Sequence, residues 1–241
     1  MFRDSDHEYG VPFPGRVLPG TQWTTTGLRG VEPPFDWARI FGRQAPHVVD
    51  LGCGNGRYLI ASALARPECD HLGIDVVQVA LDYAAQRANR RGLTNVRFVI
   101  GDAVTWMEDY FVDGSVEEVH IYHPQPYYEA TDRGRRLLTP EFLARTWAVL
   151  RPCGLLVVQT DNRAYWKYVQ RAVEKHFDAR VVAGPWPDAP GGRTRREIQA
   201  RQKGLVVWRM EARRRDVPLA IEVPSPDFDA DRPRHRKRRR M

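Results

Sequence analysis

The chain has 241 residues, of which 42% are hydrophobic, and a formal net charge of +7; this length suits one α/β domain with tails rather than two full domains. The first residues lack the apolar core of a signal peptide, and no apolar run is long enough to cross a bilayer, so we expect a cytoplasmic protein without a membrane segment. The three cysteines lack C-x-x-C spacing and the seven histidines form no H-E-x-x-H pair, which argues against a disulfide framework and against a metal site.

The N-terminal part of the chain differs in pattern from the rest. Residues 1–34 are rich in proline and glycine and show neither helical nor strand periodicity, so an extended or flexible arm is expected. Residues 35–41 have the pattern of a short amphipathic helix that Gly42 would end, and His47 to Leu51 predict the first strand. We therefore place a folded domain at 35–215 and a flexible tail at 216–241.

A glycine-rich turn follows the first strand. Gly52, Gly54 and Gly56 stand at every second position after the acid Asp50, and glycine permits positive φ and a close backbone approach to a ligand. A dinucleotide fingerprint would need its third glycine at Arg57. The pattern is instead G-x-G-x-G after an acid, which resembles motif I of Rossmann-like S-adenosylmethionine-dependent methyltransferases. An ordinary strand-to-helix turn is the alternative.

The next two predicted strands also end in acids. Residues 71–76 form a short apolar run with Asp75, whose carboxylate can accept hydrogen bonds from both hydroxyls of a ribose or cap a turn. A helix follows this run and is expected to end near Arg90, Arg91 and Gly92. The third strand is then expected at Val96 to Ile100. Asp102 and Ala103 follow, at the position where methyltransferases of this kind hold adenine.

The fourth predicted strand, Val116 to Tyr122, leads into a proline-stiffened loop. Prolines flank Gln125, and Tyr127 with Tyr128 offers an aromatic face on which a purine can stack; a surface turn with packed tyrosines is the alternative.

The second half continues the alternation of helix and strand. Thr139 and Pro140 open a helix that is expected to end at Cys153-Gly154. A fifth strand is expected at 155–159, a helix at 164–176, and an antiparallel pair formed by 181–182 with 205–208.

The basicity lies in the tail. Residues 232–240 carry seven Lys and Arg side chains, which equals the formal net charge of the whole chain. Such a block favours a polyanion such as nucleic acid as its partner, although a solvated tail without a specific partner fits equally well.

Three ordered motifs in the second half resemble the bacterial tRNA (guanine-N7)-methyltransferase family. Pro124-Gln125-Pro126-Tyr127 with Arg135-Arg136-Leu137 is similar to the family's P-D-P-W and its basic loop ending R-R-L. Thr160-Asp161 resembles its T-D segment, and Thr194 with Glu197 its T-x-x-E block. The resemblance covers about residues 35–213.

The resemblance implies an α/β Rossmann-like methyltransferase fold: a mostly parallel seven-stranded sheet with an antiparallel C-terminal strand pair and helices on both faces. It implies methyl transfer from S-adenosylmethionine to N7 of a guanine in the variable loop of tRNA. We expect a monomer or homodimer that holds no metal. A diverged methyltransferase acting on another RNA or a small molecule, and a catalytically weakened RNA-binding module, are the alternatives.

The resemblance also implies roles for individual residues. Catalytic roles fall on Gln125 and Asp161. Cofactor-binding roles fall on Asp50, Gly52, Gly54, Gly56, Asp75, Asp102 and Ala103. Substrate-binding roles fall on Asp161, Thr194, Glu197, Tyr127, Arg135 and Arg136. The chain departs from the family in one loop, where the family's Asp, Trp and Lys are replaced by Gln125, Tyr127 and Glu129.

Overall fold

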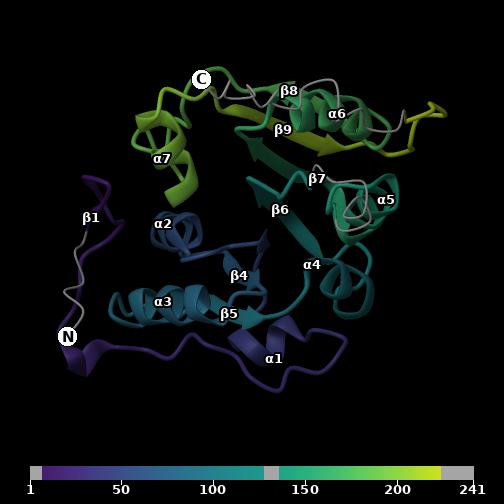
Figure 1. Ribbon diagram of the computed structural model, residues 1–241. Helices are drawn as coiled ribbons and strands as arrows, with labels where there is room; N and C mark the ends of the chain where they lie inside the picture. The colour runs from purple at the N-terminus through teal and green to yellow at the C-terminus, as the bar shows by residue number, and fades with distance from the viewer. Residues whose placement is uncertain (1–6, 128–135, 224–241) are drawn as a thin grey trace, which may run out of the picture.

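A seven-stranded sheet forms the centre of the molecule in the computed structural model, which describes residues 7–127 and 136–223 (Figure 1). The strand order is β5-β4-β3-β6-β7-β9-β8. The strands are β3 (His47–Leu51), β4 (Asp70–Asp75), β5 (Val96–Ile100), β6 (Val116–Tyr122), β7 (Leu150–Thr160), β8 (Phe177–Val181) and β9 (Trp208–Arg214). Strand β9 is antiparallel to both of its neighbours, and the other pairs are parallel. The predicted mostly parallel sheet is confirmed.

Helices cover both faces of this sheet (Figure 1). They are α1 (Trp37–Phe41), α2 (Arg57–Ala65), α3 (Gln78–Asn89), α4 (Ala103–Thr105) with a π-helical turn (Trp106–Tyr110), α5 (Pro140–Val149), α6 (Arg163–Glu174) and α7 (Arg195–Gln202). Side chains of a strand alternate between faces. Val48 thus joins one apolar core with α2 and α3, whereas Val49 joins a second core with α5 and α6.

The predicted cap at Thr139 and the predicted stop at Gly42 are both present, and Asp36, expected inside the first helix, is instead its N-cap. The Asp36 side chain accepts a hydrogen bond from the Arg39 N–H at 3.0 Å and starts α1, and Gly42, at φ 72°, ends it. Thr139 Oγ1 accepts from the Phe142 N–H at 3.1 Å and starts α5. These helix starts therefore follow from short-range chemistry.

Several expected boundaries in the second half were wrong, including that of the strand expected at 181–182, which is β8 at Phe177–Val181. Helix α5 ends at Val149, and β7 starts at Leu150 instead of 155, because Leu150 pairs with Val116 across a shift in register. Residues 205–207 stay outside the sheet, because the pairing of β9 with β7 begins at Trp208 opposite Thr160. Helix α7 was not predicted; its sequence is almost entirely polar and lacks an apolar stripe.

The described part of the N-terminal arm runs along the edge of the domain (Figure 1). It contains a two-stranded hairpin of β1 (His7–Glu8) and β2 (Val11–Pro12), followed by a turn of 3₁₀ helix at Gly20–Gln22. The Leu18 N–H donates to the Arg90 carbonyl at 2.8 Å, and Leu28 N–H to the Phe98 carbonyl at 2.8 Å. These bonds hold the arm against α3 and cover the edge strand β5.

Candidate active site

The glycine-rich turn has the conformation that its sequence requires. Gly52, Gly54 and Gly56 have φ of 78°, 53° and 72°. A side chain at Gly56 would begin 2.9 Å from Ala84 Cβ and 3.0 Å from the Phe98 ring, so this glycine lets α2 pack closely on the neighbouring elements. Among the described residues, no atom beyond the adjacent residues of the chain lies within 4 Å of a Cβ built on Gly52 or Gly54. Those two positions leave open space beside the turn.

Asp75 and Asp102 organise the ends of β4 and β5. Asp75 Oδ2 accepts from the Gly54 N–H at 2.7 Å, and its Oδ1 accepts from the Val77 N–H at 2.9 Å. Asp102 caps α4 by accepting from two free N–H groups of its first turn, at 3.0 and 3.1 Å. Each Asp75 oxygen keeps a lone pair for a further donor, whereas both N–H groups at Asp102 donate to the same oxygen, Oδ1.

Asp50 is the most deeply buried acid of the turn, with 1% of its surface exposed. Burial, and then the nearby charge of Asp75, raise the pKa of Asp50 well above its usual range. Its Oδ1 atom has no hydrogen-bond partner among the described residues. Burial disfavours the charged form of this carboxyl group, and a positively charged ligand group beside it would offset that cost.

Two cavities meet beside this turn. The strand-end cavity, of about 680 Å³, lies at the carboxyl ends of four parallel strands and is lined by Gly52, Asp75, Asp102, Ala103, Gln125, Tyr127 and Arg136. The helix-side cavity, of about 370 Å³, is lined by Asp50, Gly54, Asn55, Tyr58, Thr194 and Arg196. Gly52, Tyr122 and His123 line both cavities. This junction lies where β3 adjoins β6, the place at which open α/β sheets bind ligands.

The loop after β6 forms one wall of the strand-end cavity. Gln125 is exposed there, and Tyr127 has a positive φ of 44°. Arg136 is buried and donates to the carbonyl oxygens of Pro126 at 2.8 Å and of Tyr127 at 2.5 Å. Its guanidinium thus ties residue 136 to the described end of the loop after β6. Arg135 and Glu129 lie outside the described residues, as does the basic segment 232–240.

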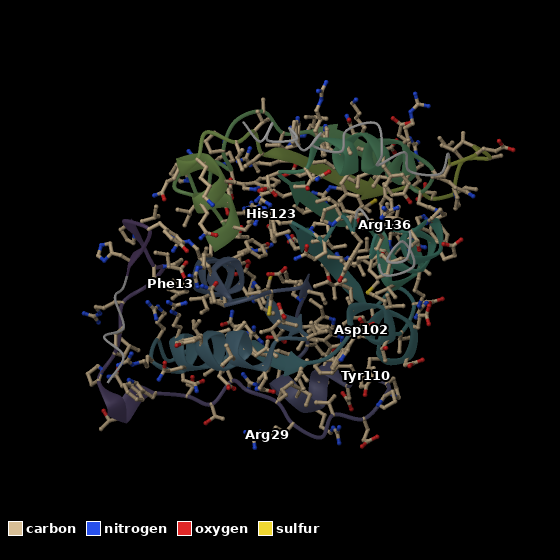
Figure 2. All side chains as sticks on the ribbon, in the orientation of Figure 1. Phe13, Arg29, Asp102, Tyr110, His123 and Arg136 are labelled. Atoms are coloured by element: carbon tan, nitrogen blue, oxygen red, sulfur yellow. The ribbon has the colours of Figure 1, made fainter. Side chains whose placement is uncertain are left out.

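Asp161 directly follows β7, and its carboxylate is bonded to two residues that line the cavities. Its Oδ1 accepts from His123 Nδ1 at 3.0 Å, and its Oδ2 pairs with Arg196 at 2.9 Å. Burial raises the pKa of Asp161, but the hydrogen bonds from His123 and Arg196 outweigh burial and lower it to about 2. Figure 2 shows His123 between α7 and the end of β6. Asp161 is therefore an anion at neutral pH.

Thr194 and Glu197 hold the start of α7. Thr194 Oγ1 accepts from the Glu197 N–H at 3.1 Å, and Glu197 Oε2 accepts from the Arg193 N–H at 2.8 Å. Glu197 is fully buried, and its other oxygen forms an ion pair with Arg209 at 2.5 Å. Thr194 lines the helix-side cavity, whereas the buried Glu197 holds the start of α7 in place through its bonds to Arg193 and Arg209.

The motifs gave no signal for the roles of Arg57 and Glu8. Arg57, which replaces the third glycine of a dinucleotide fingerprint, is 5% exposed and donates to the carbonyls of Pro12 at 2.6 Å and Gly192 at 3.2 Å. It also pairs with Glu8 at 3.2 Å, and Glu8 accepts from the amide of Asn55 in the glycine-rich turn. The start of α2 therefore joins the arm, the turn and the loop before α7.

A buried polar cluster orients Tyr122, which both cavities share. The Tyr122 hydroxyl accepts from Arg193 at 3.0 Å and lies 3.0 Å from His120 Nδ1. His120 Nε2 lies 2.9 Å from Glu118 Oε2. Burial lowers the pKa of His120 despite this acid and keeps the imidazole neutral, so Nδ1 accepts from Tyr122 while Nε2–H donates to Glu118.

Over residues 7–127 and 136–223, no helix combines the length and apolar character that a bilayer span requires. Within the same ranges, no three His, Cys, Asp or Glu side chains gather closely enough to hold a metal ion.

Two solved structures with the same fold are named as methyltransferases. The structure matches the 16S rRNA methyltransferase KamB with a TM-score of 0.57 at 18% identity, over 79% of this chain and 98% of that one. It matches the 16S rRNA (adenine(1408)-N(1))-methyltransferase from Catenulisporales acidiphilia with a TM-score of 0.53 at 20% identity, over 78% and 92%. These matches confirm the Rossmann-like methyltransferase fold.

Sequence relatives are closer. The tRNA (guanine-N(7)-)-methyltransferase of Alkalilimnicola ehrlichii is 31% identical over 85% of this chain and 91% of the relative. The protein of the same name from Nocardia farcinica is 37% identical over 61% and 55%, and that from Nitrosococcus oceani is 28% identical over 83% and 87%. A family model described as "Putative methyltransferase" matches residues 44–210. The chain therefore belongs to the tRNA (guanine-N7)-methyltransferase family.

Proposed function

We propose that this protein transfers a methyl group from S-adenosylmethionine to N7 of a guanine in the variable loop of tRNA. The observation that carries the proposal is the meeting of two cavities at Gly52, Tyr122 and His123, with the anionic Asp161 bonded to His123. One cavity has the acids that a nucleoside needs, and the other is bordered by the start of α7, which belongs to the T-x-x-E block.

The residues around the glycine-rich turn fit the cofactor. Asp75 has lone pairs free for the ribose hydroxyls, and Asp102 with Ala103 borders the space for adenine. The unpartnered Asp50 Oδ1 suits the positively charged methionine end. When bound, S-adenosylmethionine supplies a methyl group on a sulfonium, which any nucleophile with a free lone pair can attack.

Guanine N7 carries such a lone pair, so the step removes no proton and needs no general base. Positioning is then the main contribution of the protein, and orientation can supply up to roughly 7–11 kcal/mol of a barrier. This explains how a chain with Gln125 in place of an acid can still act. An amide at this position keeps a hydrogen bond to the guanine edge but stabilises the developing ring cation less than a carboxylate does.

Gln125 and Asp161 contact the reacting guanine, and Tyr127 stacks on a base of the substrate. Thr194 and Glu197 hold the loop that contacts the nucleotide, and Arg135 with Arg136 serves the RNA-binding loop. The tRNA partner, the monomeric or homodimeric state, the absence of a metal and the cytoplasmic location belong to the same proposal.

A transfer assay tests the proposal. Purified protein with labelled S-adenosylmethionine is offered bulk tRNA, ribosomal RNA and a metabolite extract in separate reactions. We expect label in tRNA alone. Label in ribosomal RNA or a metabolite would replace the proposal by a diverged methyltransferase, and cofactor binding without transfer to any of the three would replace it by an RNA-binding module.

A further inference from the structure

A chain of hydrogen bonds runs from a buried tryptophan to Asp161 behind the junction of the two cavities. Trp186 Nε1 donates to Gln159 Oε1 at 2.5 Å, Gln159 Nε2 lies 2.8 Å from His123 Nε2, and His123 Nδ1 lies 3.0 Å from Asp161 Oδ1. Trp186 and Gln159 are 1% and 0% exposed. The motifs that carry the family resemblance give no role to Trp186, Gln159 or His123.

The indole N–H of Trp186 fixes which groups donate and which accept along this series of hydrogen bonds. An indole N–H can only donate, so the Gln159 atom that faces Trp186 must be the carbonyl oxygen. The Gln159 NH₂ group therefore faces His123 Nε2, which must accept. The proton of the neutral imidazole then sits on Nδ1 and is donated to Asp161.

The backbone also fixes the imidazole in place. The His123 N–H donates to the Gln159 carbonyl at 2.6 Å, and His123 has a positive φ of 52°, which is uncommon outside glycine. Side-chain exposure is 6% for His123 and 10% for Asp161. Both ring nitrogens and the backbone N–H of His123 are therefore hydrogen-bonded, and the residue lies in the wall that the two cavities share.

The hydrogen-bond partners of the two Asp161 oxygens differ in how easily a ligand could displace them. Oδ1 accepts from the buried His123, whereas Oδ2 pairs with Arg196, whose side chain is 62% exposed. An incoming N–H donor can displace the exposed guanidinium without disturbing the buried bond. The guanine Watson–Crick edge carries such donors at N1 and N2.

We propose that His123 is a positioning residue, fixed as the neutral Nδ1–H tautomer by Trp186 and Gln159, which anchors Asp161 Oδ1 and leaves Oδ2 to accept from the guanine of the substrate. The second half of this statement rests on the proposed function. The first half concerns the protein alone and can be tested without any methyl acceptor.

Histidine side-chain ¹⁵N NMR of the full-length protein at neutral pH tests the tautomer. The His123 signals are assigned as those missing from His123→Phe. We expect a protonated Nδ1 and an unprotonated Nε2 in the wild type. In Gln159→Glu the carboxylate cannot donate, so Nε2 should gain a proton. An Nε2–H tautomer or an imidazolium in the wild type would overturn the inference, whatever the substrate proves to be.

Kinetics with tRNA test the positioning of Asp161. His123→Phe keeps the ring shape but removes the donor, and we expect KM for tRNA to rise about tenfold or more with a smaller change in kcat, because the lost bond involves a charged group. His123→Asn retains an N–H near the Nδ1 position and should recover most of this loss. Equal KM in all three proteins, or no recovery in the folded Asn variant, would contradict the role. Absence of tRNA methylation by the wild type would instead refute the proposed function and leave the NMR result standing.

Discussion

The two halves of the site are built from contacts of different range. In the half at the ends of β3, β4 and β5, Asp102 caps the helix that it starts, and Asp75 bonds a turn 21 positions earlier in the chain. In the half at β6, β7 and α7, His123 bonds Asp161 across 38 positions, and Asp161 pairs with Arg196 across 35. The first half is assembled by neighbouring βα units, whereas the second depends on the whole sheet being closed by its C-terminal strands.

The largest expected effect comes from a substitution in the half of the site at β6, β7 and α7, whose contacts are long-range in sequence. Glu197→Ala leaves the buried Arg209 charge without its partner, so we expect the free energy of unfolding to fall by about 3–5 kcal/mol in urea denaturation. The matched control is the double change Glu197→Leu with Arg209→Met, which removes both charges and should cost less than the single change. A double variant less stable than Glu197→Ala would contradict this interpretation of the pair.

The next effect concerns the short-range half. Asp75→Ala removes the acceptor of the Gly54 N–H and the proposed ribose contact. Two lost bonds to a charged group predict a Kd for S-adenosylhomocysteine about 100-fold higher, measured by isothermal titration calorimetry. Asp82→Ala on the exposed face of α3 is the control and should leave the Kd unchanged. Equal losses in the two variants would mean that the acid at the end of β4 has no special role.

Low pH should reduce the stability of β4, which carries part of the site half at β3, β4 and β5. Burial, with the nearby Arg66 charge, lowers the pKa of His71 to about 3, and its ring bonds Ser62 at 2.9 Å. The unfolded chain takes up a proton near pH 6.5 and the folded chain does not, so this contribution is complete above pH 6.5 and is lost as the pH falls toward 3. We expect it to lower the unfolding free energy by about 2 kcal/mol between pH 7 and 5. His71→Gln should lose correspondingly less over that interval; an unchanged pH dependence would refute the assignment.

The smallest effect is a gain. Gln125→Asp restores the acid that the family carries in the loop after β6, and we expect kcat for tRNA to rise about tenfold, or roughly 1.4 kcal/mol. The comparison is with Gln125→Ala, which should fall below the wild type in the same steady-state assay. A rate for the Asp variant at or below that of the wild type would show that position 125 does not face the developing charge.

The sequence was most informative where structure is local. Strands β3 and β5 begin and end as predicted, and Thr139 caps α5 as predicted, because strand alternation and N-capping act over a few residues. The start of β7 at Leu150 was missed because it is determined by pairing with Val116.

The same distinction applies to the site. The glycine turn and the acids at or just beyond the ends of three strands could be found from their spacing, and their cofactor roles remain predictions. His123, Arg57 and Glu8 could not be found, because a lone histidine, arginine or glutamate has no local pattern and acquires its role from partners supplied by distant segments. Arg57 stands where a glycine would have indicated a different cofactor.

Nucleoside mass spectrometry of tRNA incubated with the protein and S-adenosylmethionine tests the proposed activity most directly. We expect N7-methylguanine to appear with the wild type and to be strongly reduced with Asp161→Asn, while both proteins bind S-adenosylhomocysteine with similar Kd. A different methylated nucleoside, or equal N7-methylguanine from wild type and variant, would contradict guanine N7 as the acceptor that Asp161 helps to bind.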